Sequence, residues 1–179
     1  MQIERVPESQ YVIPKELLWV FILTMAIVLQ YVATMYTATM SARIKSFTRA
    51  FMEQFDEEHR EAFPGKERAP EWGYPDTGNG RFGKKLPYAD WFRMGNGQRC
   101  QINFLEHLHF LILSPIIVAL WFPIVAIVLQ CVIFVGRLMF TIGYTFGGPS
   151  KRIFGAITMD LAIFVSFGFM VAACIKLAI

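Results

Sequence analysis

Residues 107–136 read HLHFLILSPIIVALWFPIVAIVLQCVIFVG, a stretch of 30 residues without Asp, Glu, Lys or Arg. A single helix of that length would reach about 45 Å at 1.5 Å per residue, which is too long for the ~30 Å hydrocarbon core of a bilayer. The segment WFP at 121–123 lies near the middle of the stretch, and proline interrupts helices. We therefore expect two membrane-spanning helices, over 100–121 and 124–146, with a turn between them.

Two further apolar runs flank this pair. Residues 17–42 contain no charged side chain, and residues 153–175 contain a single one, Asp160. Each run is long enough for a span, which needs about 20 residues. The sequence therefore predicts an all-α integral membrane protein. Residues 1–179 would form one four-transmembrane-helix bundle with a long loop between helices one and two.

The overall composition agrees with a membrane protein. Of 179 residues, 55% are hydrophobic and 17% are charged, against roughly 25% charged residues in soluble domains, which excludes a soluble enzyme. The net charge is +3, and without a long basic run we expect no nucleic-acid partner. The three cysteines have no CxxC or zinc-ligand spacing, so we expect neither a disulfide framework nor a metal site.

The predicted first loop has two parts. Phe47, Phe51 and Phe55 recur at four-residue spacing among charged residues, which predicts that the first helix continues past the membrane surface until Pro64. Residues 64–98 hold seven glycines and four prolines, a composition typical of loops. Within them GNGRFG at 78–83 matches GxGxxG, but no strand precedes it as a dinucleotide site requires, so we expect no nucleotide here.

The basic residues predict the orientation of the bundle. Residues 41–101 carry 11 of the 17 lysines and arginines, and Lys151 and Arg152 lie in the third loop, whereas the second loop has none. By the positive-inside rule, the first and third loops face the inner, cytoplasm-equivalent side of the membrane.

With this topology, polar residues from all four helices gather at the inner end of the bundle. On the second helix, Arg99, Asn103 and Glu106 share one face because they are spaced four and three residues apart. Arginines can bind carboxylates bidentately and can stabilise a thiolate, so the set suits a small peptide thiol. The alternative is structural: Glu106 would neutralise Arg137, and Asp160 would pair with a basic residue.

The segments RCQINFLE at 99–106, GRLMF at 136–140, GY at 143–144 and GPSKR at 148–152 carry a resemblance. Together they resemble the membrane-associated eicosanoid and glutathione metabolism (MAPEG) family. The sequence is most similar to its microsomal glutathione transferases of the third type. The similarity covers about residues 96–176 well, the first helix weakly and the loop hardly at all.

The resemblance implies a four-helix bundle that forms homotrimers and binds glutathione between protomers near the inner membrane face. Arg43 is the nearest match to the arginine that would activate the thiol. Phe140 departs from the family pattern, in which a tyrosine contacts glutathione. The resemblance assigns glutathione binding to Arg99, Gln101, Asn103, Glu106, Tyr144 and either Lys151 or Arg152; the polar cluster adds Arg137.

Two functions follow as hypotheses. The first is a membrane glutathione transferase or peroxidase that acts on lipophilic electrophiles entering from the surrounding lipids. The second is a catalytically altered MAPEG-fold accessory subunit of a larger membrane complex, such as a mitochondrial respiratory complex, with the aromatic residues of the long loop as its docking surface. The charge bias fits either the endoplasmic reticulum or a mitochondrial membrane.

Overall fold

The computed structural model describes residues 15–178, and over that range the chain forms helices and no strand. Four helical segments within it are long and apolar enough to cross a membrane, as predicted. The first segment, Lys15–Ser46, is continuous but contains a π-helical stretch. The spans consist of α1 (Lys15–Thr34), the π-helix η1 (Met35–Met40) and α2 (Ser41–Ser46), then α5 (Tyr88–Ala119), α6 (Pro123–Gly147) and α7 (Ile153–Ala178).

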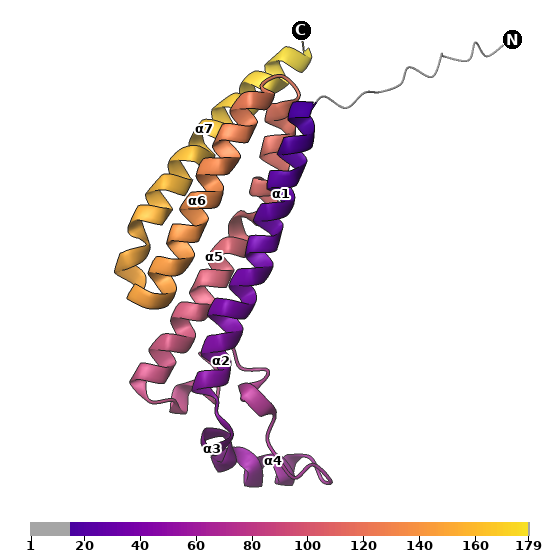
Figure 1. The fold of residues 1–179 in the computed structure, drawn as a ribbon. Coiled ribbons are helices and arrows are strands. Elements are labelled where there is room, and N and C mark those ends of the chain that lie inside the picture. The colour runs from indigo at the N-terminus through magenta and orange to yellow at the C-terminus, as the bar shows by residue number, and fades with distance from the viewer. Residues whose placement is uncertain (1–14, 179) are drawn as a thin grey trace, which may run out of the picture.

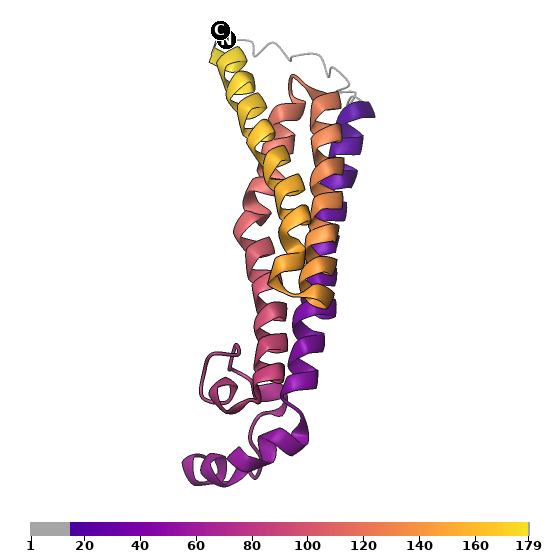
Figure 2. The same ribbon diagram turned by 90° about the vertical axis from the view of Figure 1, so that its left-hand side faces the viewer.

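The four spans form an elongated bundle (Figures 1 and 2). Helix α6 contacts α1, α5 and α7 and so holds the bundle together. The start of α1, the α5–α6 turn and the end of α7 lie at one end of the bundle (Figure 1). The connection between α2 and α5 lies at the opposite end, and the α6–α7 turn lies part of the way towards it (Figure 1). The second connection is the 120–122 turn, and the third contains Gly148 and the 3₁₀-helix η5 (Pro149–Arg152).

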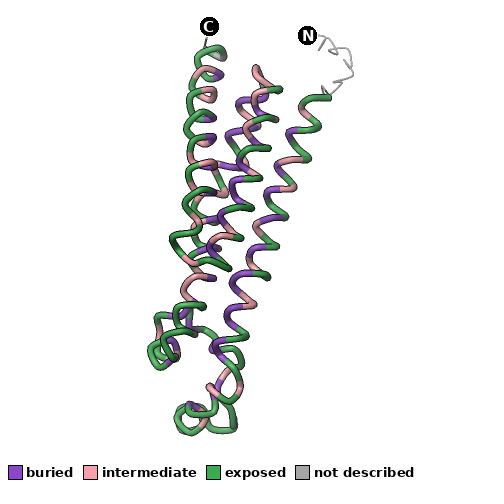
Figure 3. The backbone as a smooth tube through the Cα atoms, turned by 60° about the vertical axis from the view of Figure 1, so that its left-hand side comes forward, coloured by how far each residue is buried: buried purple, intermediate pink, exposed green. Residues whose placement is uncertain are grey.

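The distribution of burial fits a bundle surrounded by lipid. Buried residues follow the inner sides of the spans, while exposed residues follow their outer sides (Figure 3). Many of the exposed residues are large and apolar, such as Met25, Phe146 and Phe154. The centre of the bundle is packed by Ile27, Phe104, Leu111, Ile133, Met159 and Ala162.

Glycines let neighbouring helices approach closely. A Cβ atom added at Gly155 of α7 would lie 2.7 Å from the carbonyl oxygen of Gly136 on α6. One added at Gly97 of α5 would lie 2.7 Å from the carbonyl oxygen of Ala38 in the π-helical stretch. Real Cβ atoms do not approach other atoms so closely, so these contacts require glycine.

Helix α5 begins at Tyr88, twelve residues before the predicted start at 100. Gly95 and Gly97, which made this region look like a loop, are both helical. Gly97 serves the close contact with Ala38, and tertiary packing of this kind overrides a weak helix propensity. At 32 residues, the helix is longer than the roughly 20 residues that a span needs, so its Tyr88 end extends past the span towards the loop.

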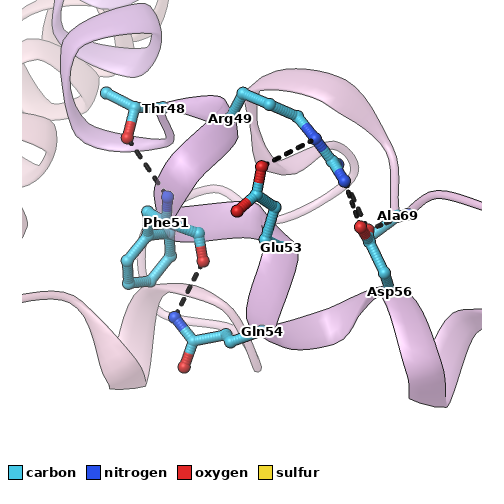
Figure 4. A network of polar contacts seen from close by, with 7 residues as sticks. All are labelled: Thr48, Arg49, Phe51, Glu53, Gln54, Asp56 and Ala69. Carbon is cyan, nitrogen blue, oxygen red and sulfur yellow. Dashed lines mark hydrogen bonds and ion pairs between the residues drawn. The ribbon is translucent and has the colours of Figure 1, made fainter.

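The first helix ends earlier than the aromatic pattern predicted. The chain leaves the helix at Phe47, and Thr48 caps a new one by accepting a hydrogen bond from the backbone N–H of Phe51 at 3.3 Å (Figure 4). A short helical unit follows, consisting of α3 (Arg49–Met52), the 3₁₀-helix η2 (Glu53–Phe55) and α4 (Asp56–Ala62), and later η3 (Glu71–Gly73) and η4 (Gly83–Lys85).

This inner unit has its own apolar core. Phe47, Met52, Phe55, Ala69, Leu86 and Met94 are buried together, so the aromatic residues pack across the unit. Arg49 pairs with the carboxylate of Asp56, which also accepts the backbone N–H of Ala69 at 2.8 Å (Figure 4). These hydrogen bonds, Arg49 first, hold the pKa of Asp56 below its ordinary value.

Candidate functional site

Arg137 lies at the centre of the polar residues inside the bundle. Its side chain is 0% exposed, and its Nη1 donates to Oδ1 of Asn103 at 2.8 Å. The guanidinium carbon lies 4.0 Å from the ring centroid of Phe104 and 4.8 Å from that of Phe140. Among residues 15–178, neither Nε nor Nη2 has a hydrogen-bond partner. Arg137 therefore offers a buried positive charge with unused donors.

Tyr144 lies two helical turns from Arg137 on α6, towards the inner end. Its ring is buried and lies 5.6 Å from the ring of Phe140, centroid to centroid. Arg152, from the turn before α7, places its guanidinium carbon 5.3 Å from the Tyr144 centroid and 5.6 Å from the Phe140 centroid. The structure thus brings together Asn103, Arg137, Tyr144 and Arg152, four of the residues that the sequence predicted.

A polar stripe extends from this cluster towards the outer end of the bundle. On α6, Gln130, Arg137 and Tyr144 are buried at seven-residue spacing, so they share one face. Nε2 of Gln130 donates to Oγ1 of Thr24 at 2.7 Å, and Nε2 of Gln30 donates to a backbone carbonyl at 3.2 Å. Polar side chains are therefore not confined to the end of the bundle at which the sequence predicted them to gather.

Arg43 holds the inner loop against the end of the first span. Its Nη1 donates to the carbonyl oxygen of Trp72 at 3.0 Å, and its Nη2 donates to that of Asp76 at 2.7 Å. The guanidinium carbon also lies 4.3 Å from the ring centroid of Tyr74. Both terminal nitrogens of this predicted catalytic residue are therefore engaged by the loop.

The GNGRFG segment surrounds a carboxylate of its own chain. Asp76 accepts hydrogen bonds from the backbone N–H groups of Gly78, Gly80 and Gly83 at 2.7–2.8 Å. Burial of Asp76 opposes its ionisation, but the backbone N–H donors outweigh this effect and keep its pKa below the ordinary value. Backbone N–H groups arranged in this way could bind a phosphate, but here they bind the carboxylate of Asp76. This contact accounts for the glycines of the GNGRFG segment.

Three of the remaining predicted residues line two neighbouring cavities, which have Gln98 in common. Gln101 and Arg43 line a cavity of about 410 Å³ beside the π-helical stretch, together with Tyr36, Thr39 and Tyr74. Arg99 lines another of about 450 Å³, on the outward face of α5. Within a single chain, these side chains do not converge on one pocket.

Glu106 and Lys151 are both exposed. Within residues 15–178, the ion pairs expected if the polar residues had only a structural role are not formed. Arg137 bonds to Asn103 rather than to Glu106, and neither Glu106 nor Asp160 has an ion-pair partner in this range. Glu106 lies on the outward side of α5, within a span. A carboxylate exposed to lipid is energetically costly, so we expect another group to cover Glu106 on this face of α5.

Comparison with known proteins supports the fold and the motif. The sequence has no match among curated proteins. A family model described as the MAPEG family matches residues 17–173, from the first span into the last. Since this match extends over most of the chain and over all the motifs quoted above, the chain belongs to the MAPEG family.

Proposed function

We propose that this chain is a glutathione-dependent membrane transferase or peroxidase that acts on lipophilic electrophiles. The closest functional type would be the microsomal glutathione transferases of the third type. MAPEG membership supports a role of this general kind. The endoplasmic reticulum or a mitochondrial membrane would be its location, with the inner unit on the cytoplasm-equivalent side.

One observation carries the proposal: the glutathione-binding residues expected from the motif lie on different sides of a single chain. Arg43 and Gln101 line one cavity, while Arg99 lines another and Glu106 faces outwards. Copies of the chain packed around an axis can bring the first set of one protomer to the second set of its neighbour. A homotrimer would also cover the exposed carboxylate of Glu106.

The donor set fits glutathione, which carries two carboxylates, an ammonium and a thiol. Arg99 can bind a carboxylate, Glu106 can accept the ammonium, and the amide of Gln101 can bind either group. No hydrogen bond or ion pair within residues 15–178 occupies these three side chains. Their polar atoms are therefore available to a ligand.

The chemistry needs positive charge next to the thiol. Glutathione supplies the nucleophile, so no protein nucleophile is required. The thiol gives its proton to solvent water. The resulting thiolate attacks the electrophilic carbon to form a thioether as the leaving group departs with the bonding pair. We propose that Arg152, whose guanidinium lies beside the ring of Tyr144, stabilises the thiolate. Arg43 could stabilise the thiolate only from its present position, because its two terminal nitrogens donate to carbonyl oxygens of the loop.

Calorimetry with the full chain purified in detergent tests the proposal. We expect glutathione to bind, and we expect native mass spectrometry to give three copies. Glu106→Gln should weaken glutathione binding about tenfold, because an amide holds an ammonium less well than a carboxylate does. Glu67→Gln, the same change at an exposed position outside the cavities, is the control. Absence of binding at millimolar glutathione would refute the proposal.

The accessory-subunit function remains a second candidate because of the exposed aromatic residues of the inner unit and of the start of α5. Phe63, Trp72, Tyr74, Tyr88, Trp91 and Phe92 are all exposed, and aromatic residues are enriched at protein interfaces. Gentle solubilisation followed by native sizing distinguishes the two functions. Stoichiometric co-purification of other polypeptides would favour the accessory role, whereas a free homotrimer would argue against it.

A further inference from the structure

The cavity at Arg99 has two walls that come from different parts of the chain. Helix α5 forms one wall, and the loop before η4 forms the other. The cavity measures about 450 Å³. Thr77 and Asn79 line it from the loop, and Asn96, Gln98 and Arg99 supply its polar groups from α5.

The loop wall is held in place by hydrogen bonds of the residues that neighbour Thr77 and Asn79 in the chain. Thr77 follows Asp76, whose carbonyl oxygen accepts from Arg43 and whose carboxylate accepts from the glycine N–H groups. Asn79 lies between Gly78 and Gly80, and the N–H groups of both glycines bond to that carboxylate. The backbone at Thr77 and Asn79 is therefore preorganised, although both side chains are exposed.

The chemistry of the lining suits an anionic group such as a carboxylate. Arg99 is the one charged residue among the described residues that line the cavity, and none of them is Asp or Glu. The amides of Asn79, Asn96 and Gln98 and the hydroxyl of Thr77 can add neutral donors. A carboxylate without a neighbouring ammonium suits this set, because an ammonium would find no anionic partner here. In glutathione, that group is the carboxylate of the glycine end.

We propose that Thr77 and Asn79 bind the glycine carboxylate of glutathione together with Arg99, so that the loop contributes directly to ligand selectivity. This inference rests on the proposed function, since it names a further part of the same site. It also gives the long loop a role within the binding site itself. Asn79, with the longer side chain and two donors, is the stronger determinant.

The test compares two ligands and two variants by calorimetry on the full chain in detergent. The ligands are glutathione and its ethyl ester at the glycine carboxylate. Asn79→Ala should weaken glutathione binding about tenfold, as expected for loss of a hydrogen bond to a charged group. The same variant should bind the ester as the wild-type protein does, because the ester has already lost that interaction. Glu67→Ala, exposed in the same loop region, should leave both affinities unchanged.

The outcomes separate this inference from the proposed function. If the wild-type protein binds glutathione and Asn79→Ala binds both ligands with wild-type affinity, the loop assignment is refuted while the function stands. An equal loss for both ligands would also refute it, because the variant would then act through the loop fold rather than through the carboxylate. If the wild-type protein binds no glutathione, both are refuted.

Discussion

Arg137 illustrates how a membrane bundle accommodates a buried cation that forms no ion pair within residues 15–178. The rings of Phe104 and Phe140 lie close to its guanidinium, and Asn103 accepts one hydrogen bond. Cation–π contacts of desolvated groups contribute about 2 kcal/mol or more, and a planar guanidinium stacks on rings better than a compact ammonium does. The aromatic neighbours therefore stabilise this charge where water cannot.

Arg137→Lys tests that account. The variant keeps the charge and one donor but loses the stacking, so we expect it to destabilise the protein by about 2 kcal/mol. Thermal unfolding in detergent measures the change. Arg93→Lys is the matched control, because Arg93 is exposed and its ion pair with Asp90 at 2.7 Å can be made by lysine. Equal melting temperatures for Arg137→Lys and the wild-type protein would contradict the role of the rings.

Asp76 makes the loop sensitive to acid. Its pKa is lower in the folded loop than in an unfolded chain, where it is near the ordinary value of 3.8. A lowered folded pKa means that the carboxylate stabilises the loop above about pH 4. That contribution is lost as the pH falls through the folded pKa.

Amide proton shifts of Gly78, Gly80 and Gly83 in NMR spectra check this pH dependence. They should change together with a midpoint below 3.8. In Asp76→Asn, the three signals should lose that titration, and the loop should resemble the acid form already at neutral pH. A midpoint at or above the ordinary value would show that the N–H groups do not hold the ionised form.

At the scale of elements, the contact between α6 and α7 depends on missing side chains. Gly155→Ala would place a methyl group against the backbone of Phe140 and the carbonyl oxygen of Gly136. Because the obstructing atoms belong to the backbone, the helices would have to separate. We expect a lower melting temperature and weaker packing around Phe140, measured by thermal unfolding in detergent.

Gly168→Ala provides the control on the same helix. A Cβ atom added at Gly168 meets nothing within 4 Å, and alanine has the better helix propensity by up to about 1 kcal/mol. This variant should therefore be as stable as the wild-type protein or slightly more stable. If both substitutions had the same effect, close packing at Gly155 could not be the reason for its glycine.

The helices also show which parts of the fold could be predicted from the sequence. Charge-free runs of sufficient length predicted four spans, because length and charge alone limit what crosses a membrane. The start of α5 could not be predicted, because Gly95 and Gly97 are unfavourable for helices. Gly97 is required by its close contact with Ala38, a residue far away in the chain. Local pattern likewise failed at Phe47, where packing onto Met94 replaces a continued helix.

The site was predictable to a similar extent. The motif identified Asn103, Tyr144 and either Lys151 or Arg152, and the polar cluster added Arg137. The structure places Asn103, Arg137, Tyr144 and Arg152 in one cluster. The seven-residue spacing of Gln130, Arg137 and Tyr144 was a signal in the sequence for the longer polar stripe. The hydrogen bonds of Arg43 to the loop and those of the glycine N–H groups to Asp76 depend on the conformation of the loop, which no local sequence pattern predicts.

For the whole molecule, the bundle predicts opposite accessibility of its two ends. In a background where the three cysteines are replaced by serine, Lys84→Cys marks the inner unit and Leu120→Cys marks the α5–α6 turn. Both positions are exposed. An impermeant maleimide added to the cytoplasm-equivalent side of sealed vesicles should label the first variant and spare the second. The reverse pattern would overturn the orientation.

The carboxylate of Asp76 has a consequence for how this protein can evolve. A Cβ atom at Gly80 would lie 2.8 Å from that carboxylate, one at Gly83 would collide with the carbonyl oxygen of Gly78, and Gly78 has a φ of +104°. None of these glycines tolerates replacement while the loop keeps its shape. The four positions should therefore be inherited as a unit: relatives that have lost the aspartate are free to lose the glycines, and relatives that keep it should keep all three.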